Sequence, residues 1–156
     1  VFEEIDFTKL IDDTAALFQI AGRMDNIKFI VNIDQKETFF SDEISLKIIL
    51  NNLFSNAFKY QRKTATDKFV EVDVEVANNN ATIYVKDNGI GIHENHIGNI
   101  FTMFYRATSQ ESGSGFGLYN VKDALAKIGG IIEVSSVLNE GTTFKVIIPG
   151  KANGAK

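Results

Sequence analysis

The chain has 156 residues, about one domain, and its 44% hydrophobic and 23% charged residues are typical of a folded protein. Cysteine is absent, which excludes disulfide frameworks, thiolate metal sites and cysteine nucleophiles. A net charge of −4 argues against nucleic acid as a partner, because such proteins usually present a basic face to the phosphates. No apolar run approaches the length needed to span a bilayer, so we expect no membrane contact by this domain.

Domain organisation is expected to be simple. Residues 1–150 contain no repeat, charge block or linker and should form one domain, followed by a polar tail at 151–156. The chain begins with Val1 rather than methionine, so we expect it to be a piece of a longer protein.

Hydrophobic patterning predicts an α+β fold. Helices are expected at residues 6–23, 42–60 and 118–128, with a short helical patch at 95–104. Strands are expected at residues 28–33, 69–77, 81–86, 131–137 and 143–148. The residues assigned to the buried faces of the first two helices are Leu10, Ile11, Leu17, Phe18 and Ala21, then Ile44, Ile48, Leu50, Leu53, Phe54 and Phe58. Helices on one face of a mostly antiparallel sheet make a two-layer α/β sandwich.

The second helix carries a polar pair at helical spacing. Asn52 and Asn56 are four residues apart and share a face, with Lys59 and Tyr60 one turn later. An amide oxygen is a suitable ligand for Mg²⁺, and a lysine supplies positive charge for a polyphosphate. Taken alone, the pair is also compatible with a solvated polar helix face.

An acidic residue ends the strand at 81–86 and is followed by two glycines. The Asp87 carboxylate can accept a hydrogen bond from an exocyclic amine such as that of adenine, whereas guanine presents a carbonyl there. Gly89 and Gly91 would let the backbone approach a flat ring. A plain Asp-Asn-Gly turn is the alternative.

Two further glycine motifs follow. Gly113, Gly115 and Gly117 run into a helix, where free backbone amides bind phosphate well, although no Walker A or dinucleotide-binding fingerprint is present. Gly141 and Thr143 belong to a Gly-Thr-Thr-Phe segment that opens the last strand and alone indicates only a hairpin.

Together and in this order, the four motifs resemble the N, G1, G2 and G3 boxes of the ATP-binding domain of sensor histidine kinases. Phe101 and Phe104 resemble the F box between G1 and G2, and the similarity extends over nearly the whole chain. Departures are mild, with His93 where proline is common and Phe116 where leucine is common.

The resemblance implies a Bergerat-type ATP site on a mixed, mostly antiparallel sheet. It implies Mg²⁺ at Asn56, the adenine amine at Asp87, and catalytic roles near the phosphates for Asn52, Lys59 and Arg106. The residues it assigns to ATP binding are Asn52, Asn56, Lys59, Tyr60, Asp87, Gly89, Gly91, Ile92, Gly113, Gly115, Gly117, Leu118 and Thr143. Residues 93–114 would be a mobile lid.

The phosphoacceptor of such a kinase is not evident here. The chain's two histidines, His93 and His96, fall in the expected lid and in no acceptor-like context. Either could be a metal ligand or a base, but solvated lid histidines are the simpler interpretation. We therefore expect a catalytic half whose partners are the dimerisation and histidine phosphoacceptor domain of a parent kinase and a response regulator receiver domain. The expected location is cytoplasmic, with a parent that can be membrane-anchored.

Related functions define the alternatives. ATP-hydrolysing relatives carry a glutamate one turn before the magnesium asparagine, where this chain has Asn52, an amide that cannot take a proton. Anti-sigma-factor serine kinases share the boxes, and a regulatory module that only binds nucleotide is a further alternative. The F box and the opening segment favour the histidine-kinase interpretation.

Overall fold

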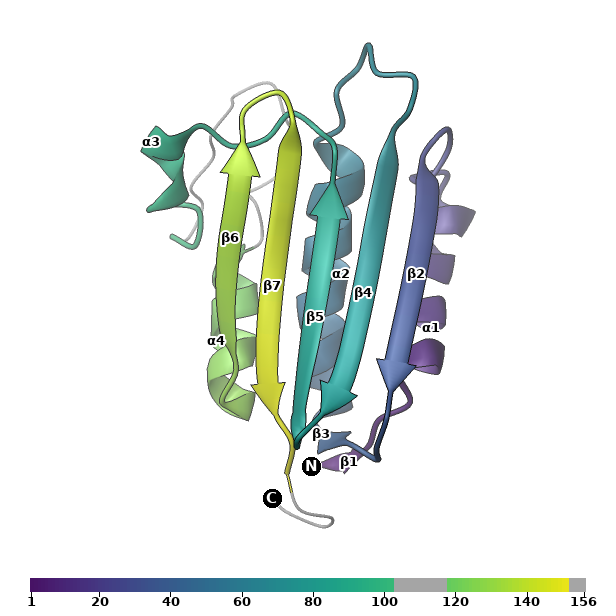
Figure 1. The fold of residues 1–156 in the computed structure, drawn as a ribbon, viewed down its shortest axis with the longest axis vertical. Coiled ribbons are helices and arrows are strands. Elements are labelled where there is room, and N and C mark those ends of the chain that lie inside the picture. The colour runs from purple at the N-terminus through teal and green to yellow at the C-terminus, as the bar shows by residue number, and fades with distance from the viewer. Residues whose placement is uncertain (103–117, 152–156) are drawn as a thin grey trace.

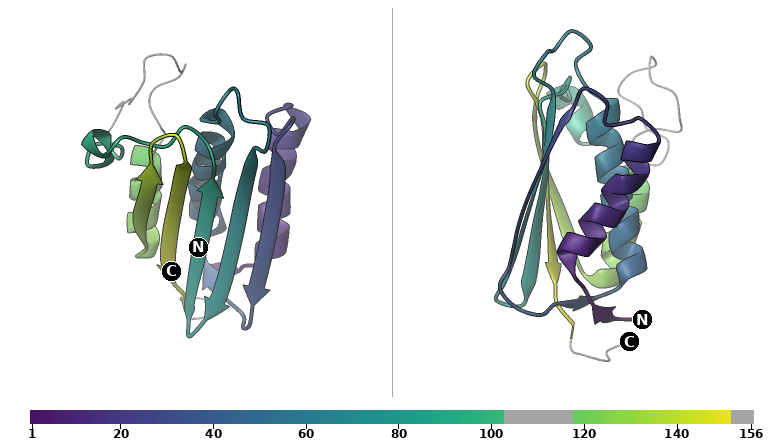
Figure 2. Two further views of the ribbon diagram at one scale, coloured as in Figure 1. Left: turned by 45° about the horizontal axis from the view of Figure 1, so that its top comes forward. Right: turned by 90° about the vertical axis from the view of Figure 1, so that its right-hand side faces the viewer.

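The computed structural model describes residues 1–102 and 118–151, which form two layers, a sheet with helices on one of its faces (Figures 1 and 2). The strands are β1 (Glu3–Glu4), β2 (Lys28–Gln35), β3 (Phe40–Ser41), β4 (Phe69–Ala77), β5 (Asn80–Asp87), β6 (Ile131–Val137) and β7 (Gly141–Pro149). The helices are α1 (Phe7–Ile20), α2 (Glu43–Lys59), α3 (Glu94–Ile97) and α4 (Leu118–Ile128).

The main sheet has five strands in the order β2-β4-β5-β7-β6. Strands β2 and β4 are parallel, whereas the other three pairs are antiparallel. Strands β1 and β3 form a separate two-stranded sheet. This mixed, mostly antiparallel sheet, with α1, α2 and α4 behind it in Figure 1, confirms the expected fold class.

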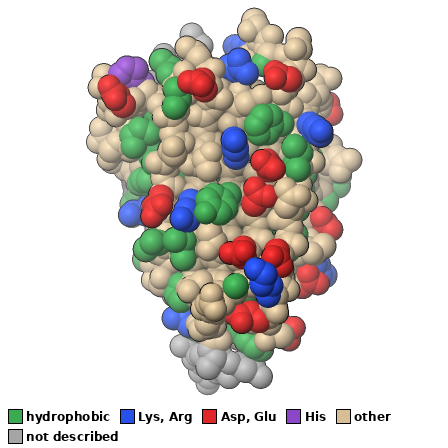
Figure 3. Space-filling view, viewed as in Figure 1, with side chains coloured by type: hydrophobic (Ala, Val, Ile, Leu, Met, Phe, Trp, Pro, Cys, Tyr) green, Lys and Arg blue, Asp and Glu red, His purple; other side chains and the backbone are tan. Residues whose placement is uncertain are grey.

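Alternation along β4 explains why one face of the sheet is covered. Val70, Val72, Val74 and Val76 are at most 3% exposed and face the helices. The intervening acidic residues lie on the open face, and Figure 3 shows acidic side chains gathered there. Two asparagines with positive φ, Asn78 and Asn79, close the β4–β5 hairpin.

Helix α2 lies at the centre of the helical layer and packs four phenylalanines together. Phe54 and Phe58 contact Phe18 of α1 and Phe29 of β2, with ring centroids 5.3 to 6.3 Å apart. Aromatic pairs at this separation add to the stabilisation from burial.

The expected buried faces were partly wrong. Leu17, Ile44 and Ile48 are 65%, 70% and 37% exposed, and Ala21 lies beyond the end of α1 in an exposed position. The prediction assigned apolar residues from two sides of α2 to one buried face. Residues 44 and 48 lie on a different side of the helix from Leu46, Leu50 and Leu53.

Two helix boundaries also differ from prediction. The first helix ends at Ile20 rather than near residue 23, and the chain continues into Gly22 with φ +72°. In the part described, up to residue 102, the helical patch expected at residues 95–104 is a four-residue helix, Glu94–Ile97. Asp6 and Asp42 cap the first two helices, because their carboxylates accept hydrogen bonds from the backbone N–H of Lys9 and Ser45.

No helix in the described part of the chain combines the length and the apolar character needed to cross a bilayer.

Candidate nucleotide-binding site

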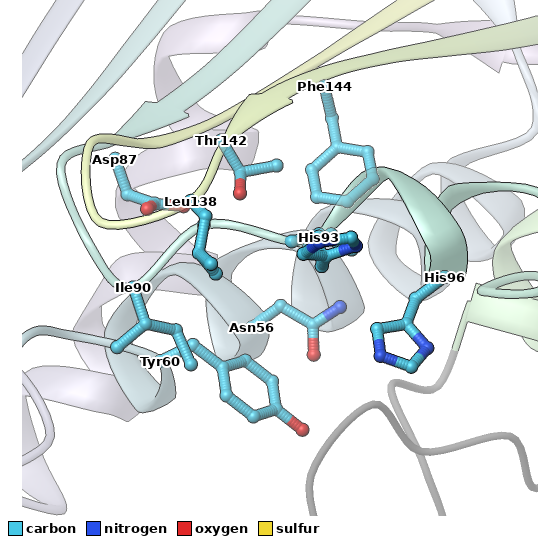
Figure 4. Close-up of a pocket in the computed structure, with 11 residues that line it drawn as sticks. Asn56, Tyr60, Asp87, Ile90, His93, His96, Leu138, Thr142 and Phe144 are labelled. Carbon is cyan, nitrogen blue, oxygen red and sulfur yellow. The ribbon is translucent and has the colours of Figure 1, made fainter.

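A cavity of about 180 Å³ opens where β5 ends and β7 begins, beside the C-terminal half of α2 (Figure 4). Its described walls come from α2, the loop after β5, helix α3 and the β6–β7 hairpin. The lining residues are Asn56, Tyr60, Asp87, Ile90, Gly91, Ile92, His93, His96, Leu138, Thr142 and Phe144.

Asp87 is the last residue of β5 and the most unusual polar group in the cavity. It is 8% exposed, and its Oδ1 accepts a hydrogen bond of 2.8 Å from the backbone N–H of Gly89. Burial raises the pKa of the carboxyl to about 7, although hydrogen bonds from the backbone N–H groups of Gly89 and Thr142 oppose the shift. A donor entering the cavity would stabilise the ionised form, so the site favours a ligand with an N–H group at this end.

The loop after Asp87 is pressed against the end of α2. The backbone N–H of Ile90 donates to the Tyr60 carbonyl at 2.9 Å, and a Cβ at Gly89 would collide with the same oxygen. Gly91 has φ +71°, and a Cβ there would collide with the Val137 carbonyl. Of these two glycines only Gly91 lines the cavity, while Gly89 allows the close approach of the loop.

Asn88 anchors the same loop from the other side. Its Oδ1 accepts from the backbone N–H of Phe69 at 2.9 Å, and its Nδ2 donates to the Asp67 carbonyl at 2.8 Å. Arg62 donates through Nε to the Asn88 carbonyl at 2.9 Å. Asn88 therefore ties the end of β5 to the start of β4, a positioning role that the sequence analysis did not assign.

Helix α2 contributes Asn56 and Tyr60 to the cavity, one helical turn apart. Asn56 is 7% exposed, and its Nδ2 has no hydrogen-bond partner among the described residues. A buried, unpaired amide in a cavity wall marks a place where a ligand can supply the missing partner. Amide rotation can also present the oxygen, so the residue fits a Mg²⁺ ligand.

The other two predicted α2 residues lie outside the cavity lining. The Asn52 Nδ2 donates to the Ile48 carbonyl at 2.7 Å, within its own helix. The Lys59 Nζ lies 5.3 Å from the centroid of the Tyr60 ring. Both remain one turn or less from cavity residues.

Strand alternation brings Thr142, not Thr143, into the cavity. Thr142 is opposite Asp87 in the β5–β7 ladder and is buried, so Thr143 points to the other face of the sheet. Thr142 is further held by Ser136, whose hydroxyl lies 2.8 Å from the Thr142 Oγ1 and accepts from the backbone N–H of Ile92 at 2.7 Å. Of these two threonines, Thr142 lines the cavity and Thr143 does not.

Other predicted residues divide into two groups. Ile92 lines the cavity and is 8% exposed, while Leu118, at 1% exposed, begins α4 and packs in the core. Phe104, Arg106, Gly113, Gly115 and Gly117, with most of the expected lid and the tail from residue 152, lie outside the described residues.

The sequence analysis missed six lining residues, Ile90, His93, His96, Leu138, Thr142 and Phe144. Ile90, His93 and Thr142 directly adjoin predicted site residues, so proximity in sequence could have suggested them. Phe144 also adjoins a predicted site residue, Thr143, whereas Leu138 arrives through the β6–β7 hairpin and no local signal marks it.

Comparison with known proteins agrees with this geometry. Residues 41–152 match the family described as histidine kinase-, DNA gyrase B-, and HSP90-like ATPase. The match covers well over half of the chain, and the chain therefore belongs to this ATPase family, which makes it an ATP-binding domain.

Its relatives within the family are sensor kinases. The chain is 31% identical over 116 residues to the probable C4-dicarboxylate sensor kinase of Bacillus subtilis, covering 74% of this chain and 22% of the relative. It is 25% identical over 151 residues to the sensor protein kinase GraS of Staphylococcus aureus, covering 95% of this chain and 42% of the relative. A solved structure of the mycobacterial sensor histidine kinase MprB superposes with a TM-score of 0.79 at 27% identity, covering 97% of this chain and 99% of that one.

These similarities confirm the expected ATP-binding domain of the sensor histidine kinase type. The chain spans less than half the length of either curated relative.

Proposed function

We propose that this domain binds ATP with adenine at the Asp87 end of the cavity and transfers its γ-phosphoryl group to a histidine of a separate domain. The observation that carries the proposal is the buried Asp87 carboxyl, which ends a strand in a cavity that also contains an unpaired amide. The adenine amine would donate to this carboxylate, whereas the guanine carbonyl would oppose it.

The metal in this proposal is Mg²⁺, held by Asn56 together with phosphate oxygens. When bound, the ion would neutralise charge on the phosphate chain. Asn56 offers a neutral oxygen ligand, and none of the described residues forms a cluster of three or more acidic, histidine or cysteine ligands that would hold a metal alone. That donor set suits an ion that arrives with the nucleotide.

In the transfer step, an imidazole nitrogen of the acceptor forms a bond to the γ-phosphorus, the bond to the bridging oxygen breaks, and ADP leaves. The chain's contribution is binding and orientation. Asn52, Lys59 and Arg106 are proposed to act near the phosphates, and Gly113, Gly115 and Gly117 to supply backbone amides there. The role that the family resemblance implied for Thr143 is assigned to Thr142 in this proposal, because Thr142 lines the cavity.

The proposed partners are the dimeric phosphoacceptor domain of a parent kinase and a response regulator receiver domain. The proposed location is the cytoplasm. Sensor kinases are the relatives that support these assignments.

Calorimetry with ATP and GTP, each with Mg²⁺, tests the nucleotide half of the proposal. We expect ATP to bind roughly 5- to 150-fold more tightly, because an unpaired buried acceptor costs about 1–3 kcal/mol. The Asp87→Asn variant should lose most of this preference, while Asp34→Asn, on the open face of the sheet, is the matched control. Equal affinity for the two nucleotides in the unaltered protein would refute the adenine assignment.

A further inference from the structure

Two histidines line the cavity at the end away from Asp87. Figure 4 shows Asp87 on one side of the cavity and His93 and His96 on the other, with the Asn56 side chain between them and Tyr60. No lysine or arginine is among the described lining residues. A phosphate oxygen that lies against these walls would therefore need a neutral N–H group as its hydrogen-bond donor.

The His93 ring is held by two contacts. Its Nδ1 accepts a hydrogen bond of 3.0 Å from the backbone N–H of Asn95, which caps α3. The ring also packs edge-to-face against His96, with centroids 6.2 Å apart and an interplanar angle of 72°. These contacts favour one orientation of the imidazole, whose residue is exposed, in the absence of a ligand.

The cap hydrogen bond also fixes the tautomer. A neutral imidazole carries hydrogen on one nitrogen, and Nδ1 is used as the acceptor. The hydrogen must then lie on Nε2, which makes this atom a donor. While Nε2 carries this hydrogen it has no lone pair free for a metal ion, and the described residues contain no cluster of three or more metal ligands.

We propose that His93 donates an Nε2–H hydrogen bond to a phosphate oxygen of the bound nucleotide and so sets affinity for the phosphate chain. The inference rests on the proposed function, because adenine at Asp87 and the metal at Asn56 bring the phosphates to the histidine end. The Asn56 side chain, 7% exposed and with no partner for Nδ2 among the described residues, lines the same cavity as His93. His96 acts on the nucleotide through the orientation of His93.

A substitution can separate this role from helix capping. Asparagine is a good N-cap residue, so His93→Asn keeps an acceptor for the Asn95 N–H but lacks the ring donor. His93→Ala removes both. Asn99→Ala is the matched control, because Asn99 is exposed, lies just after α3 and does not line the cavity.

The experiment is calorimetry of Mg²⁺–ADP and of adenosine with these variants. We expect His93→Asn and His93→Ala to bind ADP about tenfold more weakly, or ~1.4 kcal/mol, with adenosine affinity within about twofold of the unaltered protein. Asn99→Ala should match the unaltered protein for both ligands.

Three results would overturn the inference. If His93→Asn binds ADP normally, His93 is only a cap. If adenosine affinity falls as much as ADP affinity, the contact is not to phosphate. In either case, adenosine binding by the unaltered protein that depends on Asp87 leaves the proposed function standing. Absence of ADP binding by the unaltered protein would remove the proposed function and this contact with it.

Discussion

Asp87 illustrates how a single residue can be costly for folding and useful for binding. The pKa of its carboxyl is about 7 in the folded chain against 3.8 for the ordinary side chain, because burial disfavours the charge. Between these two pH values the folded state keeps a proton that the unfolded state has lost. Stability therefore falls as pH rises through this window, and the cost persists above pH 7.

The first prediction follows from this fall in stability with rising pH. Asp87→Asn should raise the free energy of unfolding at pH 8 by on the order of 2–4 kcal/mol, from about 1.36 kcal/mol per pH unit between the two pKa values. The advantage should largely vanish near pH 4, where both proteins are neutral at this position. Urea unfolding at the two pH values measures it, and a pH-independent difference would contradict the burial argument.

The second prediction concerns ligand binding by the same carboxyl. Because the ionised form accepts the adenine amine, adenosine affinity should fall by up to about tenfold per pH unit as pH drops below about 7. Adenosine is the appropriate ligand, since it lacks titrating phosphates. Calorimetry from pH 5.5 to 8 should show the decline in the unaltered protein and a flat profile in Asp87→Asn; parallel profiles would count against ionisation of Asp87.

At the residue scale, two of the residues that the sequence analysis singled out lie in the cavity wall, and one neighbour was missed. Asp87 and Asn56 were each compatible with a turn or a solvated helix face when taken alone, and the order of the motifs led to their assignment; both lie in the cavity. Thr142 was missed because a hairpin motif does not state which of two threonines faces inward. That depends on the register of β7 against β5.

At the scale of elements, α2 connects the core to the site. The same helix buries Phe54 among three other phenylalanines and carries Asn56 into the cavity. The packing of Phe54 in the core therefore fixes the position of Asn56 in the cavity.

The third prediction tests this packing. Phe54→Ala should lower the free energy of unfolding by about 3–5 kcal/mol through lost burial and the cavity it leaves. Phe54→Leu is the milder variant, expected to cost less than half as much. Ile44→Ala, at a 70% exposed position of the same helix, should stay within about 0.5 kcal/mol. Equal costs at positions 44 and 54, measured by urea unfolding, would contradict the observed face of α2.

The predictability of elements depended on their periodicity. Strand β4 alternates strictly and spans the predicted residues 69–77, whereas α2 carries apolar residues on more than one side. Ile44 and Ile48 were therefore assigned to the core although they are exposed. Sequence alone could not show which apolar side of α2 packs against the sheet, because that depends on the neighbouring elements of the fold.

At the scale of the whole molecule, the fold gathers distant segments at one end of the sheet. Asn56, Asp87 and Thr142 come from a helix, a strand end and a hairpin, and the β5–β7 ladder and the α2–loop contact hold them together. The order of the motifs predicted this assembly through family resemblance. The contact of Ile90 with the end of α2 could not be predicted from local pattern.

The fourth prediction concerns the metal. Asn56→Ala should abolish the Mg²⁺-dependent gain in ADP affinity while leaving adenosine binding within about twofold, because adenosine has no phosphate to share a metal. Asn51→Ala, an exposed position on α2, is the control. Calorimetry with and without Mg²⁺ measures it, and an undiminished Mg²⁺ effect in Asn56→Ala would assign the metal elsewhere.

Phosphoryl transfer in trans tests the central claim most directly. The domain would be mixed with γ-labelled ATP, Mg²⁺ and the phosphoacceptor domain of its parent kinase, with Asn56→Ala as the inactive counterpart. The account predicts an acid-labile, alkali-stable label on a histidine of the acceptor domain, negligible label on this chain, and slow ATP hydrolysis without the acceptor. Label on His93 or His96, an acid-stable label on a serine, or brisk hydrolysis by the isolated domain would contradict it.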